Sequence, residues 1–238
     1  MDTERTIGEI VAEDYRTARI FEKNGVDFCC NGNRRLVDVC IQSGKNLETL
    51  SNEIDEILNS KKEQYDFKTW PLDLLVDYIE KKHHRYVELQ IPVVQGYVEK
   101  IEKVHGKLHP ELLEIKTLFL ESSEELLSHM KKEESTVFPQ IRKMVQHETV
   151  VGAEQNASFG GLKSSIDMLM NEHNTEGDRF RKIASLSNDY TPPLDACNTY
   201  MVAYSLLKEF EDDLHLHIHL ENNILFPKAT AFADELMS

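Results

Sequence analysis

The sequence contains one pattern twice, and its residue types suggest a metal site. One copy begins at His129 and the other at His217; each has a glutamate four positions later, Glu133 or Glu221, and each ends in Phe-Pro. A histidine and a glutamate four apart lie on one face of an α-helix. A transition metal accepts both as ligands inside a helical bundle. A single such pair is more often a surface ion pair, but the repeat favours a site for two metal ions.

Two further helices of such a bundle should each supply a histidine. The third helical segment contains one histidine, His173. The first offers His83 and His84, and the spacing of its apolar residues favours His84 without excluding His83. An imidazole ligand also needs an outer group to orient it. The candidates are Tyr78, Glu88, Glu134 and Asp213.

Three histidines compete in the second repeat, because His215 and His219 flank His217. Residues two apart on a helix point in nearly opposite directions. Alignment of the two Phe-Pro ends selects His217, which places the other two on the surface or in outer contacts. Imidazole and carboxylate together suit iron, manganese or zinc. The predicted ligands are His84, His129, Glu133, His173, His217 and Glu221.

Helical periodicity predicts the elements that position these ligands. Four long helical patterns follow Trp70, and their short connections indicate an antiparallel four-helix bundle. Pro139 should bend the second helix just after the metal motif, and a short tail should follow Pro227. The expected helices span about residues 71–105, 110–146, 162–186 and 194–225.

The N-terminal part predicts a separate small helical domain over residues 1–62, followed by a polar linker over 63–69 and the bundle over 70–238. Thr6 and Glu9 form a capping-box pattern that begins the first helix. Asn46 can cap a later one. No alternating pattern is long enough to predict a sheet. The expected fold class is therefore all-α, with the small domain preceding the bundle.

Composition narrows the possible partners and location. The chain has 238 residues and a formal net charge of −15, which argues against nucleic acid or an anionic membrane as a partner. No apolar stretch has the length of a membrane span. The first residues lack the basic start and apolar run of a signal peptide. These features predict a cytoplasmic protein.

The cysteines are too few for a disulfide scaffold in a chain of this length. Cys29 and Cys30 are adjacent in a turn rich in glycine and asparagine, where a disulfide between neighbours would be strained. We therefore expect a reduced pair with a thiol role in receiving or passing the metal, although two small buried residues are the simpler alternative. Cys40 and Cys197 are expected to serve packing.

With these motifs in place, the sequence resembles a known family. The part after Trp70 is similar to hemerythrin-like domains, and the whole chain resembles the di-iron proteins that repair iron–sulfur clusters (the RIC family). The resemblance covers both ends of the chain in the expected order. It rests on Thr6-Ile-Gly-Glu-Ile-Val, Asp27-Phe-Cys-Cys-Asn-Gly32, His84-Arg, His129-Met-x-Lys-Glu-Glu, Glu172-His173, Pro192-Pro193 with Cys197, and His217-Ile-x-Leu-Glu-Asn-Asn-x-Leu-Phe-Pro227.

The resemblance implies two iron ions and places the family's ligands on the same six residues. It further implies repair of clusters damaged by nitric oxide or peroxide, with iron donated to damaged iron–sulfur proteins, and suggests a homodimer. Two other hypotheses fit the same site. One is a module that binds or senses oxygen or nitric oxide, and the other is an enzyme that reduces nitric oxide or peroxide.

Overall fold

The computed structural model describes residues 3–28, 31–59, 66–149 and 161–237, and its regular elements there are helices. This confirms the all-α expectation. The chain divides into two compact units, Val76–His217 and Met1–Leu75 with Ile218–Ser238. None of the helices in the described ranges is both long and apolar enough to cross a membrane.

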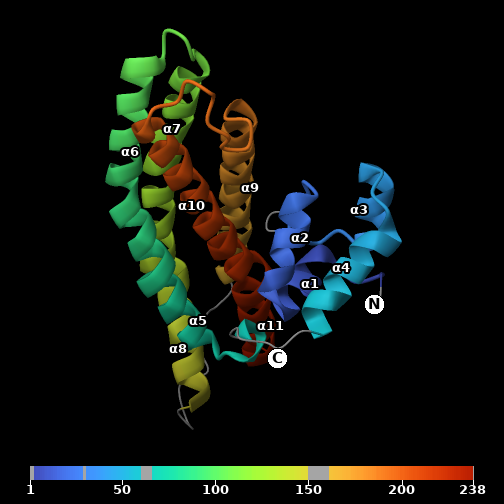
Figure 1. Ribbon diagram of the computed structural model, residues 1–238. Coiled ribbons are helices and arrows are strands. Elements are labelled where there is room, and N and C mark those ends of the chain that lie inside the picture. The colour runs from blue at the N-terminus through green and yellow to red at the C-terminus, as the bar shows by residue number, and fades with distance from the viewer. Residues whose placement is uncertain (1–2, 29–30, 60–65, 150–160, 238) are drawn as a thin grey trace. The chain divides into compact units, whose positions relative to one another are not determined.

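The unit of residues 76–217 contains four long helices whose direction alternates along the chain (Figure 1). They are α6 (Arg85–His105), α7 (Glu111–Lys132), α9 (Leu162–Leu186) and α10 (Asn198–Leu220), and α8 (Phe138–Thr149) follows α7 after a π-helical turn of five residues.

Aromatic side chains fix the packing of these helices. Phe210 on α10 is buried, and its ring centroid lies 5.3 Å from that of Phe119 on α7 and 5.7 Å from that of Phe180 on α9. Tyr86 on α6 approaches the same ring at 6.3 Å. Phe210 on α10 thus packs against one aromatic ring from each of the other three long helices.

Two ends of the fourth predicted helix differ from expectation. Its start moves from about Leu194 to Asn198 because Leu194 and Asp195 lie in a turn, in which the Ala196 amide donates to the Pro193 carbonyl at 3.0 Å. Earlier in the loop, Asn188, Asp189 and Tyr190 have positive φ, which costs non-glycine residues roughly 1–2 kcal/mol each. The expected short tail after Pro227 is wrong, since α11 (Phe226–Met237) is helical. The helix continues past Pro227 after a π-helical turn over Glu221–Leu225.

The N-terminal helices belong to the other unit. They are α1 (Ile7–Glu13), η1 (Tyr15–Thr17), α2 (Ala18–Lys23), α3 (Leu36–Ser43), α4 (Leu47–Asn59), η2 (Phe67–Thr69) and α5 (Leu72–Tyr78). The capping box is confirmed: the Thr6 hydroxyl accepts from the Glu9 amide, and the Glu9 carboxylate accepts from the Thr6 amide at 2.8 Å. Asn46 accepts a hydrogen bond from the Thr49 amide at 2.9 Å, which confirms the predicted cap.

Two glycines of this unit allow close backbone packing. The amide of Gly8 donates to the carbonyl of Gly32 at 2.7 Å. A Cβ on Gly8 would lie 2.5 Å from Asn223 Oδ1, and one on Gly32 would lie 2.5 Å from the carbonyl oxygen of Phe28. A side chain at Gly32 would therefore displace backbone, whereas one at Gly8 would first displace the Asn223 side chain. These contacts hold the segments on either side of residues 29–30.

Candidate metal centre

Three of the expected ligands lie in π-helical turns. These turns are η3 (Ile79–His84), η4 (Glu133–Val137) and η5 (Glu221–Leu225). Each is closed by an amide bonded five residues back; for example, the Phe138 amide donates to the Glu133 carbonyl and the Phe226 amide to the Glu221 carbonyl. A π turn adds one residue to the helical turn and rotates the helix faces beyond it.

Proline explains why two of these turns recur at the repeated motif. Pro139 and Pro227 have no amide hydrogen, so the carbonyl four residues earlier loses its usual α-helical donor. In the π-helical turn, hydrogen bonds between residues five apart take the place of the α-helical bonding that the proline interrupts. Pro139 was expected to bend the helix, and the structure shows an interrupted helix with a separate α8.

The six expected ligands come together in two overlapping groups. Within each group the candidate ligand atoms all lie within 4.8 Å of one another, and every residue is buried. Glu133 and Glu221 belong to both groups, while each histidine belongs to one; Glu221 lies one turn after His217 on the continuation of its helix. The groups are His84, Glu133, His217 and Glu221, and His129, Glu133, His173 and Glu221.

Interatomic distances show how the donors face each other. The two oxygens of Glu133 point to different histidines, with Oε2 3.4 Å from Nε2 of His84 and Oε1 3.3 Å from Nε2 of His129. Nε2 of His129 also lies 2.9 Å from Nε2 of His173. A carboxylate that presents one oxygen to each of two imidazole groups has the arrangement of a bridging ligand.

Carboxylates behind the rings determine the tautomers. Glu134 lies 2.7 Å from Nδ1 of His84, and Glu172 lies 2.8 Å from Nδ1 of His129. An ionised carboxylate only accepts, so Nδ1 carries a proton, and in a neutral ring Nε2 then presents its lone pair to Glu133. A lone pair facing a carboxylate oxygen is repulsive unless a cation lies between them. The donor arrangement therefore fits a metal pair.

Of the four outer groups proposed from sequence, the structure places two carboxylates against histidines, and the Tyr78 ring meets the His83 ring edge to face with centroids 5.4 Å apart. Glu134 contacts His84, and both oxygens of Asp213 lie 3.1 Å from Nδ1 of His83. Sequence reasoning missed Glu172 in this role. Its position directly before His173 was the available signal, but the imidazole it contacts belongs to His129, on a different helix.

Contacts distinguish His84 from its neighbour His83, and His217 from its neighbour His219. His83 is fully buried but belongs to neither group, and its ring stacks on that of His217 at 5.7 Å. His219 is also buried rather than on the surface. Its Nδ1 bonds with Asn223 at 3.1 Å, and burial lowers its pKa to about 3.

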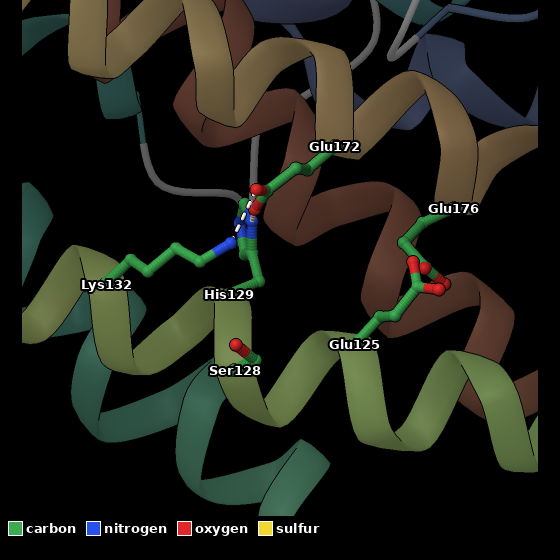
Figure 2. A pocket seen from close by; sticks show the side chains of 6 residues that line it. All are labelled: Glu125, Ser128, His129, Lys132, Glu172 and Glu176. Carbon is green, nitrogen blue, oxygen red and sulfur yellow. Dashed lines mark hydrogen bonds and ion pairs between the residues drawn. The ribbon is translucent and has the colours of Figure 1, made fainter.

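A pocket of about 210 Å³ reaches His129 (Figure 2). Burial tends to raise the pKa of Glu172, but hydrogen bonds from Lys132 and His129 outweigh it and hold that pKa below its usual value. Burial raises the pKa of Glu176, although Ser122 and Arg179 oppose the shift. The pocket is therefore lined by carboxyl groups whose pKa values are shifted in opposite directions. Its residues are Glu125, Ser128, His129, Lys132, Glu172 and Glu176.

The cysteines fall into three cases. Cys29 and Cys30 lie outside the described residues, so their expected thiol role remains a prediction. Cys40 is buried on α3, as expected for a core residue. Cys197 is exposed, and the expectation that it serves packing is wrong, because it stands on the loop directly before α10.

Comparison with known proteins agrees with this architecture. Residues 75–229 match the hemerythrin HHE cation-binding domain, and residues 3–58 match the ScdA_N domain of unknown function (DUF542). The iron–sulfur cluster repair protein ScdA of Staphylococcus haemolyticus is 31% identical over 225 residues, covering 94% of this chain and 97% of the relative. The iron–sulfur cluster repair protein YtfE of Yersinia pestis is 30% identical over 232 residues, covering 94% and 96%.

Proposed function

The chain belongs to the ScdA/YtfE family of iron–sulfur cluster repair proteins, and we propose that it repairs clusters damaged by nitrosative or oxidative stress by donating iron. The observation that carries the proposal is the pair of buried groups that share two glutamates. Two such groups, with imidazole and carboxylate donors, suit a pair of iron ions, and manganese or zinc are the alternatives.

The proposed ligands divide evenly between the two ions. His84 and His217 would hold one ion, His129 and His173 would hold the other, and Glu133 and Glu221 would bridge them. When bound, such a pair supplies exchangeable iron and open positions for a small ligand. The surrounding residues do the rest: Glu134 and Glu172 hold the imidazole rings with Nε2 directed inward.

The acidic pocket supports release of the cargo. Carboxylates of Glu125, Glu172 and Glu176 line it together with His129, and Glu172 contacts the His129 ring. Hard oxygen donors bind iron without the closed cage that thiolates form around a structural metal. We infer that an ion leaving the His129 group passes these carboxylates, while the Lys132 ammonium, 2.5 Å from Glu172, competes for one of them.

The receiving partner in this proposal is a protein with a damaged iron–sulfur cluster. Cys29 and Cys30 would receive or pass the iron, a role that requires reduced thiols and therefore the cytoplasm. The boundaries at residues 62 and 70 and the homodimer also belong to this proposal.

The test is to mix iron-loaded protein with an enzyme whose cluster has been oxidised. The proposal expects the enzyme to regain activity while this protein loses a matching amount of iron. Turnover of nitric oxide or peroxide without iron loss would instead indicate a reductase. Reversible binding of oxygen or nitric oxide, with neither repair nor turnover, would indicate a sensor. A Glu133→Gln variant provides the unloaded control, and Glu124→Gln, an exposed change on α7, provides its match.

A further inference from the structure

A second cluster of reactive side chains lies where α6 ends and α10 begins. Sγ of Cys197 lies 3.3 Å from Nε2 of His105, and the cysteine is exposed. His109 approaches Glu111 at 3.1 Å and Asp195 at 3.2 Å. None of these residues belongs to the two metal groups. The cluster is therefore separate from the metal centre in both residues and chemistry.

Several groups stabilise the thiolate of Cys197. The residue stands directly before α10, where amide groups have no helical acceptor. Hydrogen bonding from the Tyr200 amide, then from His105 and the Thr199 amide, lowers the pKa of Cys197 to about 7. Burial acts in the opposite direction on Cys40 and raises its pKa. The two thiols should therefore differ strongly in reactivity.

Packing holds the imidazole beside the sulfur. The His105 ring meets Tyr200 edge to face with centroids 5.3 Å apart, and Tyr200 is fully buried. The Tyr200 hydroxyl in turn lies 3.2 Å from the Tyr204 hydroxyl. His109 packs on the same Tyr200 ring at 5.7 Å but bonds with carboxylates rather than sulfur. The chain thus contains a matched histidine that lacks the thiol contact.

We propose that Cys197 and His105 act as a pair in thiol–disulfide exchange with small-molecule disulfides. The Cys197 sulfur attacks one sulfur of the disulfide, a new S–S bond forms and the original S–S bond breaks. The proton of the Cys197 thiol passes by way of Nε2 of His105 to the departing thiolate. Cys197 is oxidised to a mixed disulfide and the departing sulfur is reduced to a thiol, so no further reactant is needed.

The exposed position of Cys197 gives other molecules access to its sulfur. Exchange requires the incoming disulfide to approach the attacking sulfur. Cys197 is exposed, and so is Leu194, three residues earlier on the same loop. The loop itself is held in shape by the left-handed residues Asn188 to Tyr190 and by Pro192-Pro193. The thiol is thus presented on a constrained loop.

The experiment uses the full chain with Cys29→Ser and Cys30→Ser, so that only Cys40 and Cys197 remain. Oxidised glutathione is the probe, and mass spectrometry locates the adduct. At pH 6 a pKa of about 7 instead of 9.0 gives about a hundredfold more thiolate, while intrinsic nucleophilicity falls about eightfold. Cys197 should therefore react about tenfold faster than an ordinary thiol, and Cys40 should remain unmodified.

Three variants isolate the pair. Cys197→Ser should abolish the adduct, and His105→Gln should raise the pH midpoint of the reaction and slow it at pH 6. His109→Gln, the matched control on the same tyrosine, should leave the midpoint unchanged. Iron content should be equal in all three. The proposal is overturned if Cys197 reacts with an ordinary pH midpoint, if His105→Gln leaves that midpoint in place, or if Cys40 carries the adduct.

Discussion

Helices α6 and α10 have chemically reactive residues at both ends, and the two ends differ in burial. His84, directly before α6, and His217, near the end of α10, are each 1% exposed. At the opposite ends, Cys197 is exposed and lies against His105. At one end, the two helices thus place histidines in the buried interior. At the other end, they place a histidine beside a thiol that is exposed to water.

Burial explains the different chemistry of the two ends. A buried ionised group is costly unless another charge compensates it. Neutral imidazoles with carboxylates on both sides meet that requirement when a cation lies between them, as the donors around Glu133 do. At the exposed end, water and backbone amides can stabilise a thiolate without a metal. Burial therefore favours a ligand at one end and a nucleophile at the other.

The largest expected effect is at the residue shared by both metal groups. Glu133→Gln removes the negative charge that both groups use, so iron per chain should fall close to zero. His84→Ala affects one group only and should leave about one ion. Metal analysis of purified protein measures both. Adding a chelator should destabilise the native protein by about 3 kcal/mol or more, and the Glu133→Gln protein by much less.

Two controls make that result specific. Glu124→Gln changes an exposed carboxylate on the same helix and should leave iron content unchanged. Cys197 lies at the opposite ends of α6 and α10 from the metal groups, so Cys197→Ser should retain full iron content. If Glu133→Gln keeps both ions, the buried donors do not form the proposed centre.

The next effect concerns the carboxylates behind the rings. Glu134→Gln removes the acceptor 2.7 Å from Nδ1 of His84 and should lower metal affinity about 10–100-fold. Glu88→Gln changes an exposed carboxylate on α6, which sequence reasoning ranked equally, and should have no such effect. Competition with a chelator of known affinity measures both. Equal affinity in the two variants would mean that ring orientation does not depend on Glu134.

Sequence reasoning selected the six residues that the structure brings together and named Glu134, which contacts one of their rings, but it missed Glu172. The repeat selected His129 and His217 because covalent spacing fixes which residues share a helix face. Pairs between helices, such as Glu172 with His129, depend on packing that spacing does not encode. The same limit explains Cys197. Its place after Pro192-Pro193 suggested packing, whereas the structure exposes it at the end of the loop before α10.

The smallest expected effect is at His109, in the exposed cluster. Hydrogen bonds to Asp195 and then Glu111 raise the pKa of His109 above its usual value. The folded state therefore binds the proton more tightly than the unfolded state. This stabilisation is complete below the unfolded pKa of about 6.5 and disappears as pH rises through the folded value.

His109→Gln should lower the melting temperature slightly at pH 5 and have less effect at pH 9. Because His109 and its two carboxylate partners are close to solvent, 1 M salt should reduce the difference in melting temperature between the variant and the parent protein at pH 5. An equal loss at both pH values would show that His109 acts through its packing on Tyr200 rather than through charge.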